Sequence, residues 1–182
     1  MPGRTPHEAV VDYLSPLKQC VANLGHPTII VGRKHRYVLN AEGYWRLGAE
    51  DGLQLRMSSP GSSGYFSAKQ RYRIVEVDRE RFPDADGQYR VTTLQYAYEM
   101  RIDGIVEWQM HWHPQGNSPE THPHNHFANQ PGAHLPCARH TSGCSRMVYR
   151  VRRVPTRDDW RDRLLETKQR HEQYRTWSDK PT

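Results

Sequence analysis

Two runs of alternating residues, joined by a tight-turn dipeptide, constrain the fold of this chain more than any other feature. Tyr89–Arg101 carries tyrosine and apolar residues at partly alternating positions, and Ile105–Trp112 follows directly after Asp103-Gly104. Alternation with period two is typical of β-strands, and Asp-Gly is one of the dipeptides that close two-residue hairpin turns. We therefore predict an antiparallel β-hairpin over residues 89–112.

Shorter runs before this hairpin predict further strands. Between residues 28 and 77 the chain has period-two stretches that are separated by Gly, Asn and Asp turns and by the flexible loop Ser58–Gly64. With the hairpin they favour an antiparallel sheet of about five to seven strands. The candidate strands are Thr28–Val31, Tyr37–Leu39, Tyr44–Leu47, Leu53–Met57, Tyr65–Val77 and, after the hairpin, Met147–Val154.

The N-terminal segment predicts an amphipathic helix over Pro6–Leu24. Apolar residues recur there at three- and four-residue steps, and Thr5 followed by Glu8 fits a capping box. Pro16 lies inside this pattern, and a proline in a helix interior removes one backbone hydrogen bond and clashes with the preceding turn. A break or kink near Ser15, with two short helices in place of one, is therefore expected.

These elements place the chain in the α+β class, as a single domain over residues 1–182. A second helix is expected to begin at Thr156, where an acidic residue three positions later resembles a capping box. No internal repeat and no linker long enough to separate two domains is present in the sequence. The expected parts are an N-terminal helical segment (1–25), an antiparallel sheet (26–112), a histidine-rich loop (113–146) and a basic C-terminal helix (156–176).

Composition excludes several classes of protein. Hydrophobic residues make up 35% of the 182 residues, and no apolar run approaches the length of about 18 that a membrane helix needs. Three cysteines are an odd number, and no apolar export signal precedes them, so a disulfide framework is not expected. We expect a cytoplasmic protein without a membrane partner.

Charge is concentrated at the C-terminal end. Residues 1–138 hold 14 basic and 14 acidic residues, whereas residues 139–182 hold 12 basic and 6 acidic ones, so the net charge of +6 lies in the last 44 residues. Such a segment favours a polyanionic partner such as RNA or DNA. The alternative is a solvated helix face with intrahelical pairs such as Asp158–Arg161 and Asp159–Arg163.

The outstanding chemical feature is a run of five histidines within 16 residues. His111 and His113 are two apart at the end of a predicted strand, so their side chains should point to the same face of the sheet. His122, His124 and His126 repeat this spacing. Two kinds of chemistry compete for such a cluster.

The first is metal binding. Neutral imidazoles on one strand face suit Zn, Fe or Ni, with a third ligand from the second group of histidines or from Glu120. The pattern is a poor match to the cupin motif, because Glu120 follows His113 by seven residues and the flanking glycines are missing. A separate run could close a tetrahedral zinc site, with the ligands His134, Cys137, His140 and Cys144.

The second is general acid–base catalysis without a metal. Histidine can accept and donate protons near neutral pH, and metal-independent RNA cleavage needs a base, an acid and a cation that stabilises the developing phosphate charge. The histidines could supply the first two and Arg139 the third. Tyr96 and Tyr98, which could equally be packing residues, could stack on bases. Substrate contacts are expected from Tyr96, Tyr98, Asn117, Arg146 and Arg150.

Motifs for nucleotide-dependent chemistry are missing from the sequence. There is no Gly-x-x-x-x-Gly-Lys-Ser/Thr phosphate loop, no Gly-x-Ser-x-Gly nucleophile elbow and no glycine-rich dinucleotide fingerprint after a strand. ATP-dependent and dinucleotide-dependent reactions are therefore disfavoured.

The middle third of the chain resembles the TumE-type toxins of bacterial toxin–antitoxin systems and their uncharacterised relatives. The shared pattern is a tyrosine-rich strand, a turn, a second strand and a proline- and histidine-rich segment. The matching residues are Tyr72–Val77, Tyr96–Arg101, Asp103-Gly104, Val106–Trp112, Asn117, Pro119, His122-Pro123-His124-Asn125-His126 and Leu135-Pro136.

This resemblance implies a growth-inhibiting toxin that acts on RNA or translation and is neutralised by a DNA-binding antitoxin. By position it points to His122, His124 and His126 as the functional residues. The sequence thus leaves three hypotheses open. They are a metal-independent ribonuclease toxin with no cofactor, a metal-binding protein or metal-dependent enzyme that uses the same histidines, and a non-catalytic nucleic-acid-binding module.

Overall fold

A computed structural model shows an α-helix packed on an eight-stranded antiparallel sheet. The structure describes residues 2–24, 28–33, 37–48, 52–114 and 120–137, together with six isolated residues between 159 and 169. The α+β class is therefore confirmed. The predicted strand at 147–154 and almost all of the predicted helix at 156–176 lie outside the described residues.

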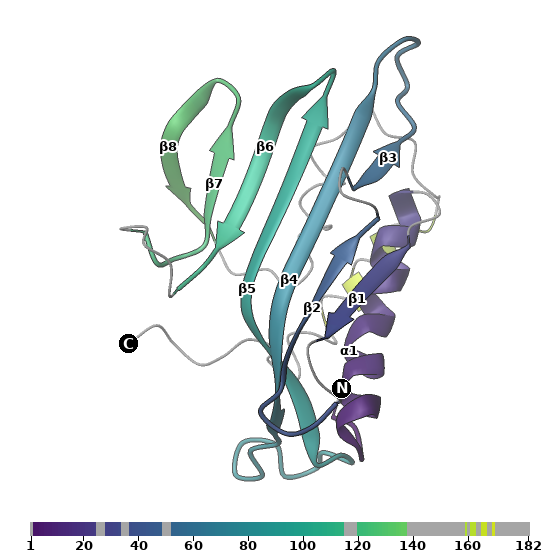
Figure 1. Cartoon of the computed structure of the whole chain (residues 1–182), viewed down its shortest axis with the longest axis vertical. Coiled ribbons are helices and arrows are strands. Elements are labelled where there is room, and N and C mark those ends of the chain that lie inside the picture. Colours follow the sequence, from purple (N-terminus) through teal and green to yellow (C-terminus); the bar gives the residue numbers. More distant parts are fainter. Residues whose placement is uncertain are drawn as a thin grey trace.

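The strands follow one another across the sheet almost in chain order. Their order is β1-β2-β4-β5-β6-β7-β8, and β3 pairs with the free end of β4 (Figure 1). Neighbouring strands of this sheet pair in the antiparallel direction. The strands are β1 (Ile29–Arg33), β2 (Glu42–Leu47), β3 (Leu53–Leu55), β4 (Gly64–Glu76), β5 (Tyr89–Ile102), β6 (Ile105–Trp112), β7 (His124–Phe127) and β8 (Gln130–Pro136).

The hairpin predicted from the sequence is confirmed as β5 and β6. Asp103 and Gly104 form its turn with φ values of 51° and 81°. Positive φ at both central residues is the geometry of the type I′ turn, whose twist matches that of the flanking strands. Four upstream candidates also correspond to strands, β1 to β4. The predicted strand at Tyr37–Leu39 is wrong, because the chain turns there and Asn40 adopts a left-handed φ of 62°.

The N-terminal helix α1 spans Pro6–Val21, and a short 3-10 helix, η1 (Ala22–Leu24), follows it. Thr5 caps α1 by accepting a hydrogen bond from the backbone N–H of Glu8 at 3.1 Å. The helix continues through Pro16, so the predicted break is wrong. Pro16 is buried, and the apolar residues before and after it pack on the same sheet, which outweighs the loss of one backbone hydrogen bond.

The core lies between α1 and one face of the sheet. The helix contacts β4 and β5, and buried side chains alternate along the strands, so that even-numbered residues of β4, of β6 and of the second half of β5 face the helix. A bulge shifts the register between β4 and β5, so that in the first half of β5 the odd-numbered Val91 and Thr93 are buried on this side. Gln70 lies in this core, where its side-chain oxygen accepts hydrogen bonds from the Tyr13 hydroxyl at 2.5 Å and the Trp45 indole at 2.8 Å. The opposite face, here called the open face, carries the odd-numbered residues of β4, of β6 and of the second half of β5.

The segment predicted as a histidine-rich loop is in part a second hairpin. β7 and β8 extend the sheet beyond β6, at the edge farthest from α1 (Figure 1). Only four residues form β7, which is too short to give an alternation signal, and its buried Asn125 accepts a hydrogen bond from the Trp108 indole of β6 at 3.0 Å. Pairing with a neighbour, rather than local sequence, therefore makes these residues a strand.

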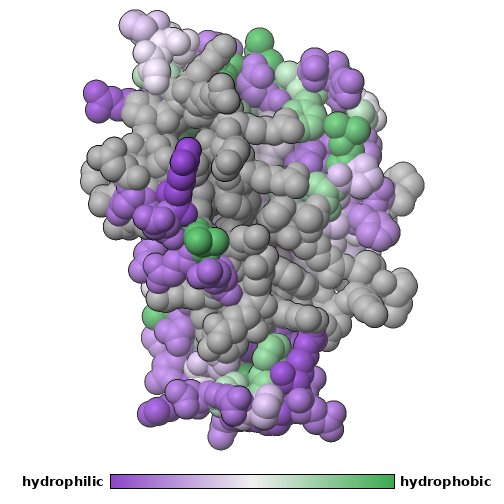
Figure 2. Space-filling view, turned by 180° about the vertical axis from the view of Figure 1, so that it is seen from behind, coloured by the Kyte–Doolittle hydropathy of each residue, from purple (hydrophilic) through white to green (hydrophobic). Residues whose placement is uncertain are grey.

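Among the coloured residues of the face seen in Figure 2, apolar side chains are interspersed with hydrophilic ones. In the part of the chain that the structure describes, no helix has the length and hydropathy that crossing a bilayer would require.

Candidate functional site

Five histidines meet on the open face of the sheet. His111 lies directly opposite His124 in the pairing of β6 with β7, and Gln109 lies opposite His126. His126 shares a face with His124, because residues two apart on a strand do so. His113 directly follows β6, and its ring lies 6.2 Å from that of His111. The fifth imidazole is His134 of β8, whose ring stacks on that of His124 with centroids 4.8 Å apart.

The rings are close enough for their nitrogens to converge. Neighbouring ring centroids are 4.6 to 6.2 Å apart, the closest pair being His126 and His134. Two groups of three histidines each bring one ring nitrogen per residue to within 4.8 Å of the others. The groups are His111, His113 and His124, and His124, His126 and His134. Each is compact enough to surround one metal ion.

His124 belongs to both groups and is the most buried of the five, with 1% of its surface exposed. Its Nδ1 lies 2.9 Å from the backbone carbonyl oxygen of His122. A carbonyl can only accept, so Nδ1 carries the proton of the neutral ring and Nε2 keeps its lone pair. A backbone carbonyl that fixes the tautomer in this way is a common outer partner of metal-binding histidines.

His111 is held in its neutral form. Burial lowers the pKa of His111 to about 4, and the neighbouring His126, His124 and His113 contribute in the same direction, while the Glu99 carboxylate opposes them weakly. At neutral pH the His111 ring is therefore uncharged and offers a lone pair to a metal ion or a proton.

His122 stands apart from this cluster. Its side chain is 68% exposed and pairs with the Glu120 carboxylate at 3.1 Å. The backbone N–H of His122 also bonds that carboxylate, which lowers the pKa of Glu120. His122 therefore contributes its carbonyl oxygen to the site, as the acceptor for His124, and not its imidazole. The sequence-based prediction of His122 as a site residue alongside His124 and His126 differs from this arrangement.

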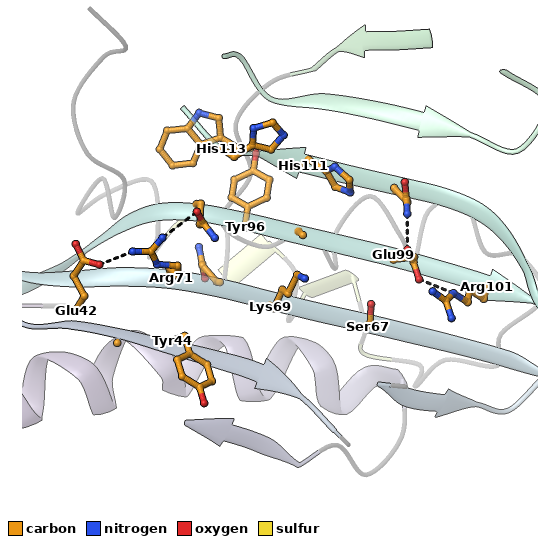
Figure 3. A pocket seen from close by; sticks show the side chains of 16 residues that line it. Glu42, Tyr44, Ser67, Lys69, Arg71, Tyr96, Glu99, Arg101, His111 and His113 are labelled. Carbon is orange, nitrogen blue, oxygen red and sulfur yellow. Dashed lines mark hydrogen bonds and ion pairs between the residues drawn. The ribbon is translucent and has the colours of Figure 1, made fainter. Parts of the chain in front are cut away.

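A groove of about 1110 Å³ runs across the open face and reaches the cluster at His111 and His113 (Figure 3). Charged residues of both signs line it. Arg71 pairs with Glu42 at 2.6 Å, and Arg101 pairs with Glu99 at 2.6 Å. Lys69 has no ion pair among the residues that the structure describes. The groove thus brings the Lys69 ammonium group to the same surface as the histidines.

Tyr96 and Tyr98, predicted as base-stacking residues, belong to the core. They are 4% and 1% exposed, and their rings stack on each other with centroids 5.1 Å apart. Tyr96 also packs against Trp112 at 5.8 Å. Their even numbers place them on the helix side of β5, so neither ring offers a free face to a base, although Tyr96 reaches the border of the groove.

The other predicted site residues divide into two sets. His134 and Cys137 are described, and among the described residues His134 groups with His124 and His126, while Cys137 is a partly buried cysteine. This differs from the predicted set of His134, Cys137, His140 and Cys144. The rest lie outside the described residues, namely Asn117, Arg139, His140, Cys144, Arg146 and Arg150.

Sequence reasoning missed the residues of the groove. Tyr44, Lys69 and Arg71 line it, and none was singled out from the sequence. A signal did exist, because from residue 66 to residue 74 the odd positions carry Ser, Lys, Arg and Arg, while the even positions carry apolar or aromatic residues apart from Gln70. Which strands lie beside that polar face was not readable from the segment itself.

Comparison with known proteins yields no match to a family model, to a curated protein or to a solved structure. The geometry of the site therefore carries the functional argument.

Proposed function

We propose that this protein is a metal-dependent hydrolase whose histidine cluster binds one transition-metal ion of the Zn²⁺ class. The observation that carries the proposal is the convergence of His111, His113 and His124, whose ligand nitrogens lie within 4.8 Å of one another beside an open groove. Three imidazoles with a fourth position left for water or substrate form a donor set that catalytic zinc sites use.

The donor set favours Zn²⁺ or a similar ion over Ca²⁺ and Mg²⁺. Both groups of three contain only imidazole nitrogens, whereas Ca²⁺ and Mg²⁺ prefer carboxylate and carbonyl oxygens. The neutral state of His111 and the tautomer of His124 both leave nitrogen lone pairs for the ion. A bound ion would supply Lewis-acid chemistry at the end of the groove, and water would be the second reactant.

The groove supports the assignment to an enzyme rather than a purely structural site. His111 and His113 line the groove and are half-buried, so a ligand there would lie next to two members of the cluster (Figure 3). Structural zinc sites, in contrast, are closed by four protein ligands.

Metal content of the purified full-length chain tests the proposal. After loading with Zn²⁺ and dialysis, we expect about one equivalent per chain by elemental analysis. His124→Ala removes the ligand that the two groups of three share and should weaken Zn²⁺ binding at least tenfold by calorimetric titration. His113→Ala removes one ligand of the proposed group and should weaken binding less, because His124, His126 and His134 remain. His122→Ala is the matched control, because it removes an exposed imidazole but keeps the carbonyl that orients His124.

Two outcomes would contradict the metal site. One is a wild-type chain that retains no Zn²⁺, and the other is a set of variants that bind Zn²⁺ as tightly as the wild type. Since His124 is buried, circular dichroism should accompany His124→Ala, and the half-buried His113 provides a variant less disruptive to folding.

A metal-independent ribonuclease toxin, neutralised by a cognate antitoxin, is the second candidate. It is favoured by the same groove, which brings His111 and His113 onto one surface with Lys69, so that proton-transferring groups and a phosphate-binding cation lie together. RNA cleavage that survives excess chelator but is lost in His113→Ala would support this candidate over the hydrolase. Growth arrest on expression of the wild type, but not of His113→Ala, would test its action as a toxin.

A further inference from the structure

One row of side chains crosses the open face and connects the groove to the cluster. In the pairing register Arg46 lies opposite Lys69, Lys69 opposite Ala97, Ala97 opposite His111, and His111 opposite His124. Lys69 and His111 are therefore separated by two strand spacings, or about 10 Å. Ala97 between them is the smallest side chain of the row, and it leaves the floor of the groove open.

Tyr44 of β2 provides an aromatic surface at the other side of this groove (Figure 3). Tyr44 is 46% exposed, although it lies on a sheet whose other face is covered by the core. The ring lies over Gly32 of the neighbouring strand β1, where a Cβ atom would come within 1.9 Å of the ring carbon Cζ. Gly32 thus lets one side of the ring rest on the backbone while the ring remains accessible to a ligand.

The cations around Tyr44 are arranged for an extended anion. Arg71 lies opposite Tyr44 in the register and shares Glu42 with Arg73, so that two guanidinium groups are balanced by one carboxylate. Lys69, in the next open-face position along β4, adds a positive charge with no ion pair among the described residues. Phosphates spaced along a chain would meet this line of charges on the way to His111.

We propose that the groove is a binding site for single-stranded nucleic acid, with Tyr44 as a base-stacking platform and Lys69 as a phosphate contact. An exposed aromatic ring beside cations is the combination that binds single strands, since stacking needs a free base face and a duplex hides it. RNA and DNA share this chemistry. This inference rests on the proposed function in one respect, which is that the bound strand would be the substrate of the hydrolase. Binding of the strand does not itself need a metal ion.

The test is fluorescence anisotropy with labelled 12-nucleotide single strands of RNA and DNA of the same sequence. Excess chelator is present throughout, so that metal-dependent cleavage cannot interfere. Tyr44→Ala should weaken binding roughly 5- to 150-fold, the range that stacking of one base supports, while Tyr44→Phe keeps the ring and should keep the affinity. Lys69→Gln should reduce the slope of log affinity against log salt by about 0.7, as loss of one phosphate contact to a single strand requires.

Two control variants separate the groove from general effects of charge and exposed apolar surface. Lys18→Gln removes the same charge from the exposed side of α1, on the far side of the sheet, and should leave binding unchanged. Ile105→Ala shortens an exposed apolar side chain at the β5–β6 turn and should also be neutral.

Each outcome decides the proposal. Binding of both strands, or of RNA alone, with loss in Tyr44→Ala supports it, and preference for RNA identifies the substrate. No binding, equal binding of a duplex, or equal affinity of wild type and Tyr44→Ala overturns it. The chelator separates this test from the metal site, because a chain that holds Zn²⁺ but binds no oligonucleotide would retain the proposed function and lose only this inference.

Discussion

At the scale of single residues, the five imidazoles are not equivalent. His124 is shared by the two groups of three, and its Nδ1–H donates a hydrogen bond to the His122 carbonyl oxygen. Only Nε2 remains for an ion, and one nitrogen lone pair binds one ion at a time. The two groups therefore cannot be filled together, and this is why we expect one metal ion per chain rather than two.

The lowered pKa of His111 predicts a pH-dependent stability. The unfolded chain binds a proton at His111 near pH 6.5 and the folded chain only near pH 4, so the contribution of this residue is complete above about pH 6.5 and lost as the pH falls toward 4. The difference between these two pKa values corresponds to a loss of at most about 3 kcal/mol of unfolding free energy. We expect a loss of about 1–2 kcal/mol, because the ring is partly exposed to solvent. Urea unfolding of the metal-free chain at pH 7 and pH 5 measures the loss.

Substitution of His111 shows whether this residue causes the pH dependence of the unfolding free energy. His111→Asn should reduce the difference in unfolding free energy between pH 7 and pH 5, whereas the exposed His122→Asn should leave it near the wild-type value. Identical pH dependence in wild type and His111→Asn would contradict the assignment.

At the scale of elements, the β7–β8 hairpin brings three of the five histidines into the cluster. It joins the sheet through the pairing of β7 with β6, which extends over only four residue pairs. Buried within that pairing is the hydrogen bond from the Trp108 indole to Asn125. So short a strand depends on such a contact, because β7 contributes little apolar surface of its own.

Asn125→Ala should therefore weaken both the fold and the metal site. It leaves the Trp108 indole N–H without its acceptor in the core, which costs about 1–3 kcal/mol of unfolding free energy. Zn²⁺ affinity should fall with it, because His124 and His126 lie on either side of Asn125 on β7. Denaturant unfolding and Zn²⁺ titration check the two effects, with Asn129→Ala in the exposed β7–β8 turn as the neutral control.

At the scale of the whole molecule, the sheet has two faces with different roles. One face is covered by α1 and holds the hydrophobic core. The other carries the groove and the histidine cluster, whose members come from β6 and the residue after it, from β7 and from β8. A metal ion held by these strands would connect the edge hairpin to the body of the sheet.

Metal binding should accordingly stabilise the entire chain. A ligand at 100 times its dissociation constant adds about 2.7 kcal/mol to the unfolding free energy when it binds only the folded state. For a chain of this size that corresponds to a rise in Tm of roughly 5–10 °C. Differential scanning calorimetry with Zn²⁺ should show the rise in the wild type and a smaller rise in His113→Ala. Ca²⁺ at the same concentration should produce no shift.

Elements that depend on local rules were predictable from the sequence. The hairpin of β5 and β6 follows from alternation on both sides of Asp103-Gly104, and the start of α1 follows from Thr5 and Glu8. The continuity of α1 through Pro16 was not predictable in the same way. It depends on burial against the sheet, which no local rule contains.

The site shows the same division between local and distant information. The sequence by itself determined that His111 and His113 share a face and that His124 and His126 share a face, because both pairs are two residues apart within a strand or at its end. Only the tertiary structure decided that these two faces coincide and that His134 joins them, while the His122 side chain remains exposed outside the cluster. It also decided that Tyr44 and Lys69 lie on the same surface. The physical reason is that neighbours across a sheet are set by strand order and register, and those depend on contacts between residues far apart in the chain.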